Sequence, residues 1–325
     1  MVQRILVPLD GSAVAERTFP YVVALHRAFR SEVVLFRVVE AEPGRPGLFS
    51  ESMGWRLADA EARSYLKTIA GRLHGHGIET EIDVAAGRAS TEILDAIRRW
   101  DADLVVLAPN GSGKIDFSPS GGTSGKVISS ADSSFLLVQA APEAGSAESP
   151  VRRVVVPMDG SPRSEWALNL AATLARANGV ELVLVHVVAR PELLQGAGAS
   201  TEISRLADQL VEANRVAGLQ YLEERKRQLS SSELPVSTRV AVAGSVPRAI
   251  HDLAFREEGS LLALSAHGRA PGSGWPYGGV AWTLLSGSPG STLVFQDIPR
   301  RQPERTDRRG RYARVPSRFG GPGSE

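Results

Sequence analysis

The chain has 325 residues, 42% of them hydrophobic, and a formal net charge of +1. Its length favours two domains. It contains no cysteine, which excludes disulfides and thiolate metal sites, and no apolar run of the length that a membrane-spanning helix needs. The first residues also lack the apolar core of a signal peptide, so we expect a cytoplasmic protein with no membrane partner.

The charge is unevenly distributed along the chain. Residues 299–325 carry eight arginines and three acidic residues, whereas residues 1–298 carry 29 Lys and Arg against 33 Asp and Glu. The arginine-, glycine- and proline-rich tail is therefore predicted to be a basic disordered segment. Nothing before it suggests a surface that recognises a specific nucleic acid.

The sequence contains one long internal repeat. Residues 4–12 read Arg-Ile-Leu-Val-Pro-Leu-Asp-Gly-Ser, and residues 153–161 read Arg-Val-Val-Val-Pro-Met-Asp-Gly-Ser. Later landmarks pair at a larger offset, so the second copy has about eight extra residues, which we place in the region 190–215. A repeat of this length indicates a duplicated domain. The predicted organisation is domain 1 over 1–140, a linker over 141–150, domain 2 over 151–298 and the tail over 299–325.

Strands and helices alternate in both copies. Short apolar runs predict buried parallel strands, and apolar positions at helical spacing predict the helices between them. Such alternation favours a parallel sheet covered by helices on both faces. In chain order, the first copy is predicted to have strands at 5–9, 33–39, 80–84, 104–108 and 135–138, with helices at 55–74, 91–100 and 124–131. The second copy is predicted to have strands at 154–158, 182–188, 238–242, 261–265 and 292–295, with helices at 203–229, 247–255 and 280–285.

The turn after each first strand begins a further helix. Ser161 is a predicted N-cap, and Pro162 follows at the first helical position, where its missing N–H costs nothing. In the first copy Pro20 falls within the matching helix, where we expect a kink.

A ligand is expected at the carboxyl ends of the strands, where the strand order of an open α/β sheet reverses. Asp10 and Asp159 end the first strands there, and a carboxylate at this position also suits the N-terminus of the next helix. Glycine-rich loops follow the fourth strands. Each runs for nine residues between its two glycine positions, from Gly111 to Gly121 and from Gly268 to Gly278. Their backbone N–H groups can approach a phosphate at a helix N-terminus.

At these motifs the chain resembles the universal stress protein family, from Arg4 to about Val138 and again from Arg153 to about Phe295. The resemblance implies two tandem doubly wound five-stranded parallel sheets of order 3-2-1-4-5, with an adenine nucleotide alpha hydrolase-like fold. It also implies frequent homodimerisation and, in some members, ATP binding with Mg²⁺. In the family the last strands pair between domains, and here the fusion would make that pair intramolecular.

The resemblance also implies the binding residues. The carboxylates are Asp10 and Asp159, and the backbone contacts on the adenine side lie at Val38 and Val187. The phosphate-loop positions are Ala108, Gly111, Gly121 and Gly122 in the first copy, and Ser265, Gly268, Gly278 and Gly279 in the second.

Both copies depart from the family pattern at two loop positions. The first glycine is replaced by Ala108 or Ser265, and the final Ser or Thr is replaced by Gly122 or Gly279. A lost hydroxyl–phosphate hydrogen bond is worth about 1.5–3 kcal/mol, so the affinity would fall by roughly one to two decades. Thr123, one residue later, offers a hydroxyl in the first copy only.

Other chemical signals are weaker. Residues 108–115 imitate a phosphate-binding P-loop but lack its first glycine and its Ser or Thr. His74 and His76 are interpreted as a solvated loop, and no metal site is predicted. His267 lies in the second ligand loop without a nucleophile or acid paired with it in the sequence, so no catalytic residue is assigned. Trp275 and Tyr277, in the same loop, fit either a ligand lid or a surface that contacts a partner.

Three functions remain open at this point. The first is a non-enzymatic stress-response regulatory module that binds ATP in at least one domain. The second is a nucleotide-free module that dimerises or contacts a protein partner not identified by the sequence. The third is a weak ATPase, for which neither a general base nor a nucleophile can be assigned.

Overall fold

A computed structural model describes residues 2–40, 53–109, 122–139, 150–191, 201–229, 234–269 and 276–297. The predicted linker except its last residue, Pro150, the predicted tail, and the loop glycines Gly111 and Gly121 lie outside these residues. Within them the chain builds strands and helices in the predicted alternation.

The two copies contain the same succession of strands. The first copy comprises β1 (Arg4–Pro8), α1 (Ala13–Glu16), α2 (Phe19–Phe29), β2 (Glu32–Val39), α4 (Met53–His74), β3 (Thr80–Ala86), α5 (Ala89–Arg99), β4 (Leu104–Leu107), α6 (Thr123–Ser130) and β5 (Ser134–Leu137). The second comprises β6 (Arg153–Pro157), α7 (Pro162–Asn178), β7 (Glu181–Ala189), α8 (Thr201–Leu229), β8 (Val236–Ala243), α9 (Val246–Ala254), β9 (Ser260–Ser265), α10 (Gly279–Gly287) and β10 (Thr292–Phe295).

The ten strands of the described residues form one sheet of order β3-β2-β1-β4-β5-β10-β9-β6-β7-β8. Each half has the order 3-2-1-4-5 in its own strands, and every pairing within a half is parallel. The order reverses at the first strand of each half, β1 and β6, which lie between the second and fourth strands. Each half therefore has its own switch point.

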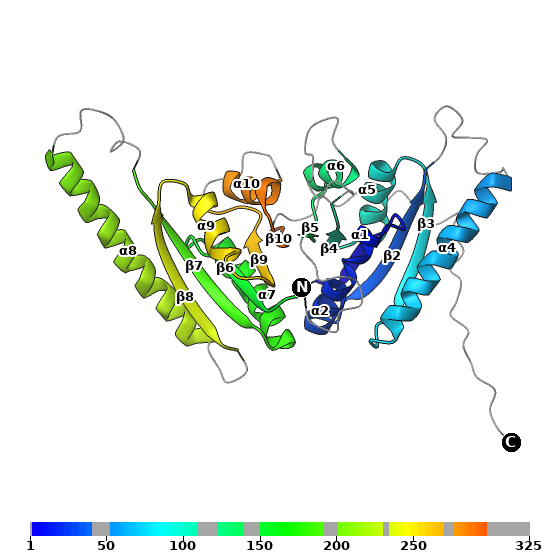
Figure 1. Ribbon diagram of the computed structural model, residues 1–325, viewed down its shortest axis with the longest axis horizontal. Coiled ribbons are helices and arrows are strands. Elements are labelled where there is room, and N and C mark those ends of the chain that lie inside the picture. The colour runs from blue at the N-terminus through cyan, green and yellow to red at the C-terminus, as the bar shows by residue number, and fades with distance from the viewer. Residues whose placement is uncertain are drawn as a thin grey trace, which may run out of the picture.

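Helices cover both faces of this sheet (Figure 1). Successive strand residues point to opposite faces, so Ile5 and Val7 pack beneath α2 and α4 while Leu6 packs beneath α5 and α6. Because both faces are covered, the inner strands are apolar almost throughout, whereas the edge strands β3 and β8 are partly exposed and carry polar residues. Each of the two core layers contains side chains from both copies.

Local capping explains how the helices after the first strands begin. The Ser161 hydroxyl accepts a hydrogen bond from Ser164 N at 3.1 Å, and Pro162 is the first residue of α7, as predicted. In the first copy the corresponding stretch is divided into α1 and α2, and Pro20 lies in the first turn of α2. The expected kink is thus a full break, because proline suits a helix start and not its interior.

The two halves join through their fifth strands. β10 pairs antiparallel with β5, with Leu293 opposite Leu136, which confirms the intramolecular pairing of the last strands. Figure 1 shows the two halves on either side of this junction, with α8 and α4 at the outer ends. The pairing protects two edges that would otherwise expose unpaired backbone groups.

Polar contacts reinforce the junction on both faces. On one face, Asn178 at the end of α7 donates to the Ala24 carbonyl of α2 at 3.0 Å. On the other, the Tyr277 hydroxyl donates to the Ile128 carbonyl of α6 at 3.1 Å. Tyr277 is buried there, so it contacts the other half of the same chain and is no ligand lid, whereas Trp275 lies outside the described residues. The described end of this loop, at Tyr277, is therefore part of the junction.

Candidate functional site

Each half has a cleft at its switch point. The first cleft is about 370 Å³ and is lined from the ends of β1, β2 and β4. The second is about 530 Å³ and is lined from the ends of β6, β7 and β9. Small-molecule sites usually fall between about 300 and 1,000 Å³, so both clefts have room for a ligand.

The structure brings most of the predicted residues together around these clefts. In the first copy Gly122 forms the N-cap of α6, next to the cleft-lining Thr123, while Gly111 and Gly121 are outside the described residues. The first cleft is lined by Asp10, Val38 and Ala108, and the second by Asp159, Val187, Ser265, Gly268, Gly278 and Gly279.

The two carboxylates share one local geometry. Asp10 Oδ1 accepts a hydrogen bond from Ser12 N at 2.8 Å, and Asp159 Oδ1 accepts one from Ser161 N at 2.9 Å. Such a bond two residues ahead closes the turn that precedes a helix. The carboxylates therefore support the helix N-termini while also lining the clefts.

In the second copy the ligand loop closes onto this carboxylate. Arg269 N donates to Asp159 Oδ2 at 2.8 Å, and the Arg269 guanidinium donates to the Asp159 carbonyl at 2.9 Å. A Cβ at Gly268 would lie 2.4 Å from Asp159 Oδ2, so only glycine permits this approach. Burial alone would raise the pKa of Asp159, but hydrogen bonds from Ser161, the Arg269 amide and Ser164 outweigh it and leave the pKa below its usual value.

In the first copy a different arginine lies at the cleft. Arg37 lines it, and its guanidinium would be 3.2 Å from a Cβ at Gly11 and is 5.0 Å from the Tyr65 ring centre. The equivalent position in the second copy is His186, whose Nδ1 donates to the Met158 carbonyl at 2.7 Å. Each cleft therefore has a cationic side chain beside its Asp-Gly-Ser turn, but the two arginines come from different elements.

The departures from the family pattern have structural consequences. Gly278 caps α10 and Gly279 begins it, so no side chain separates the cleft from the first amides of that helix. The Ser265 hydroxyl does not replace the missing one, because it donates to the His267 carbonyl at 2.7 Å. Ser124 likewise donates to the Ala108 carbonyl at 3.1 Å, whereas Thr123 lines the first cleft.

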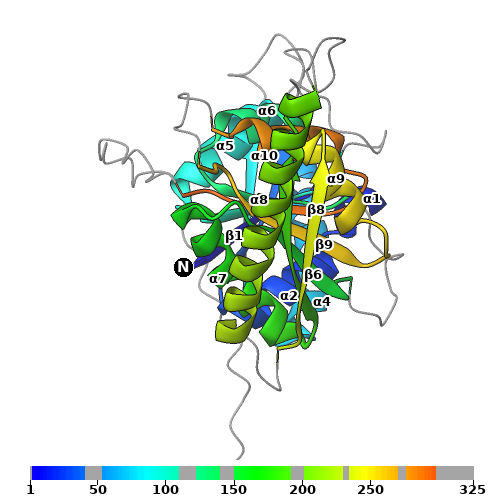
Figure 2. The same cartoon turned by 90° about the vertical axis from the view of Figure 1, so that its left-hand side faces the viewer.

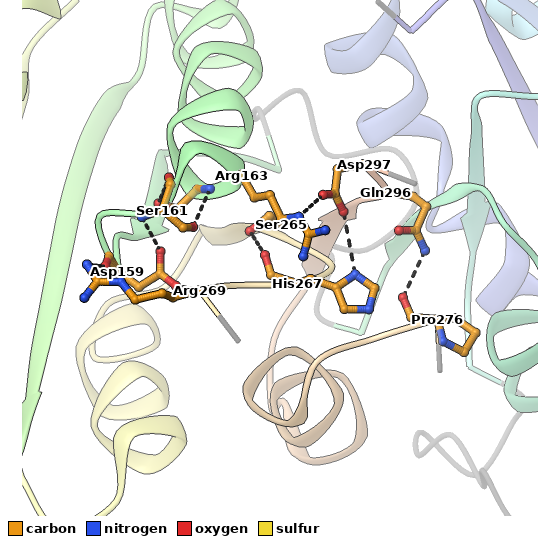
Figure 3. Close-up of polar contacts among 10 residues, drawn as sticks. Asp159, Ser161, Arg163, Ser265, His267, Arg269, Pro276, Gln296 and Asp297 are labelled. Atoms are coloured by element: carbon orange, nitrogen blue, oxygen red, sulfur yellow. Dashed lines mark hydrogen bonds and ion pairs between the residues drawn. The ribbon is translucent and has the colours of Figure 1, made fainter. Parts of the chain in front are cut away.

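A partly buried ionic cluster connects the second ligand loop to the junction (Figure 3). Arg163 at the start of α7 forms an ion pair with Asp297 at 2.6 Å, and His267 Nδ1 lies 3.6 Å from the other oxygen of Asp297. The His267 ring points away from Asp159, so the loop contributes its backbone to the cleft and this side chain to the cluster. Gln296 adds a bond of 3.0 Å to the Pro276 carbonyl.

Sequence patterns alone did not single out Arg37, Arg269, Arg163 or Asp297. Arg269 directly follows the predicted Gly268, and a cation next to an anion site is a signal that could have found it. Asp297 and Arg163 carry no such signal, since only tertiary packing brings them to the loop. His74 and His76 are exposed, and His74 pairs with Glu79 at 3.0 Å, in agreement with the predicted solvated segment.

Two kinds of feature are absent from the part of the chain that the structure describes. None of the helices there combines the length and the apolar composition needed to cross a bilayer. No group of three or more His, Asp or Glu side chains gathers there in a way that could hold a metal ion.

Fold and clefts together define a tandem, doubly wound α/β protein with one ligand-sized cleft per half. Comparison with known proteins makes the assignment specific: the universal stress protein family model matches residues 1–139 and 150–296. The chain belongs to the universal stress protein family, with two family segments in tandem.

Individual relatives match either one copy or both. A universal stress protein from Synechocystis is 30% identical over 149 residues, which are 42% of this chain and 97% of the relative. One from Mycolicibacterium smegmatis is 26% identical over 300 residues, 90% of this chain and 96% of its own. The crystal structure of a universal stress protein from Archaeoglobus fulgidus covers 91% of this chain and 99% of its own, with a TM-score of 0.59 and 16% identity, which supports the fold.

Proposed function

We propose that this universal stress protein is a non-enzymatic regulatory module that binds an adenine nucleotide in at least one of its two clefts. The observation that carries the proposal is the repeated site: a cleft at each switch point, with a carboxylate at the end of the first strand and a helix N-terminus after the glycine loop. A helix N-terminus attracts anions, which suits the phosphates of a nucleotide.

The second cleft is the larger one and supplies both surfaces that a nucleotide needs. Val187 and Ile250 provide apolar lining that suits a base, while Gly278 and Gly279 leave the α10 amides accessible to phosphates. Arg269 adds a cation at the same cleft. In the first cleft Arg37 and the Thr123 hydroxyl line a smaller volume.

Ligand binding in the second cleft has to compete with the bond between Arg269 N and Asp159. That bond, together with the missing hydroxyl at Gly279, lowers the expected affinity by at least the one to two decades that one lost hydrogen bond implies. Binding at millimolar nucleotide, the concentration range of ATP in cells, is therefore the relevant test.

Thermal unfolding with increasing MgATP tests the proposal. A ligand that binds only the native state raises the melting temperature with its concentration. Asp159→Asn should abolish the shift that arises from the second cleft and Asp10→Asn that from the first, whereas Asp95→Asn, an exposed α5 position away from both clefts, should leave the shift intact. No shift at millimolar MgATP, with no nucleotide seen in native mass spectrometry, refutes nucleotide binding.

A second function has its own supporting observation. Both oxygens of Asp159 already accept backbone hydrogen bonds, so the second cleft is internally satisfied without a ligand. In this alternative the protein is a nucleotide-free module whose paired halves contact another protein. The same titration separates the two functions, and phosphate release that Asp159→Asn abolishes would instead favour a weak ATPase.

A further inference from the structure

Helix α8 is the element in which the two copies differ most. It has 29 residues, whereas α4, its counterpart in the first copy, has 22. The difference is about two helical turns, and it falls in the region where the repeat predicts the extra residues of the second copy. Figure 1 places α8 at the outer end of the molecule, and Figure 2 shows it facing the viewer along its whole length.

The added turns of α8 carry apolar side chains that the protein leaves exposed. Ile203, Leu206 and Leu210 are 52%, 53% and 55% exposed. Ala213 and Ala217, also exposed, continue the same line at alternating steps of three and four residues. This spacing places all five side chains, which we call the α8 stripe, along one side of the helix.

The α8 stripe is distinct from the side of α8 that packs on its own sheet. Val211 and Leu222 are buried, and Leu222 packs in the core with strand residues; both lie about a third of a turn around the helix from the stripe. An amphipathic surface helix ordinarily has one apolar side, so a second one marks an interaction surface. Among the described residues of α4, Leu57 is the one large apolar side chain that is strongly exposed.

We propose that the α8 stripe binds the α8 stripe of a second copy of this chain, forming an antiparallel pair of helices. Large side chains occupy the N-terminal half of the stripe and alanines the C-terminal half. A two-fold axis level with Asp208 therefore places Ile203 opposite Ala213, and Leu206 opposite Leu210, of the second copy. The Ile203–Ala213 pairs set a large side chain against a small one, and the Leu206–Leu210 pairs pack leucine against leucine. The stripe is therefore complementary to itself, as a two-fold interface requires.

The charges beside the stripe do not oppose pairing with a second copy. Arg205 pairs with Glu202, and Arg215 pairs with Glu212, each at 2.7 Å within α8. These groups satisfy one another, so they neither repel a second copy nor select a charged partner. The first copy's α4 cannot supply the partner helix within one chain, because α4 and α8 lie at opposite ends of the molecule (Figure 1).

The expected dimer is weak. A stripe from Ile203 to Ala217 is only about 21 Å long at 1.5 Å per residue. Two such helices bury less than the roughly 1,200–2,000 Å² of a stable interface, so the dimer should form with rising concentration in the micromolar range.

Sedimentation velocity over a concentration series tests the pair. The wild-type chain should shift from one-copy to two-copy mass, and Leu206→Glu with Leu210→Glu should remain at one-copy mass. Leu57→Glu, the same change at an exposed position of α4, should sediment like the wild type. A wild type with one-copy mass throughout, or a dimer that the double variant leaves intact, overturns the proposal.

Cross-linking tests the antiparallel arrangement. The chain has no cysteine, so a single introduced thiol is unique. Gln209→Cys lies beside the proposed two-fold axis, and a short bis-maleimide should link two copies through it. Gln220→Cys is on the same side of α8, but its thiols in the pair would be about 36 Å apart along the helices and should stay unlinked. Equal linking at both positions overturns the antiparallel register.

Discussion

Removing the hydroxyl of Tyr277 tests how much one hydrogen bond contributes to holding the two halves together. The ring is 2% exposed at the junction, and the hydroxyl donates to the Ile128 carbonyl in the last turn of α6. Carbonyls at a helix end have no helical N–H to accept from, so this one depends on its partner from the other half. Burial, with Asp132 nearby, raises the pKa of Tyr277, so the hydroxyl remains a donor at neutral and moderately alkaline pH.

Replacing Tyr277 with phenylalanine removes only this bond. The ring still fills its space, while a buried carbonyl loses its partner, which costs about 1–3 kcal/mol. For a cooperative unit of about 150–250 residues each kcal/mol lowers the melting temperature by about 2–4 °C. We therefore expect a loss of several degrees in calorimetry.

A matched control separates the junction from a general effect of losing a tyrosine hydroxyl. Tyr65→Phe removes a 3.5 Å hydrogen bond from the Tyr65 hydroxyl to Glu16, which is half-buried and lies within the first copy. This change should lower the unfolding free energy by well under half as much as Tyr277→Phe. If the two variants lose equal stability, or Tyr277→Phe loses none, the hydrogen bond from Tyr277 to Ile128 does not stabilise the junction as expected.

Two further predictions concern the second cleft. Gly268→Ala should destabilise the protein and weaken nucleotide binding, because the added Cβ would displace Asp159. Gly71→Ala is the control: Gly71 lies in α4 with open space around it, so this change should raise the unfolding free energy by up to about 1 kcal/mol. Urea denaturation measures both effects on stability. Because the folded pKa of Asp159 is depressed, its contribution to stability is full above the unfolded value near 3.9 and is lost as the pH falls through the folded value. The gap in unfolding free energy between wild type and Asp159→Asn should thus be constant from pH 7 to about 5 and shrink below about 4; a gap that widens on acidification contradicts this.

Local sequence patterns were sufficient for the elements and for much of the cleft. The buried runs at β1 and β6 and the Ser161-Pro162 helix start follow from short-range preferences that the final fold does not override. Asp10 and Asp159 could be placed at the clefts because a residue that ends the first strand of a doubly wound sheet lies at the switch point.

Side chains that meet across the chain could not be predicted in the same way. The ion pair of Arg163 with Asp297 joins residues far apart in the sequence, and Tyr277 meets Ile128 from the other half. Whether Tyr277 covers a ligand or a partner depends on where its loop packs, and spacing within the loop carries no information about that.

The sequence by itself determined that one domain is present twice, which elements build it and where each cleft opens, because hydrophobic period, turn residues and capping act over a few positions. Only the tertiary structure decided that β5 and β10 merge the halves into one sheet, that Arg269 closes onto Asp159 while Arg37 lies at the other cleft, and that α8 leaves a second apolar side uncovered. These outcomes depend on which distant surfaces come into contact, and that is settled when the whole core packs.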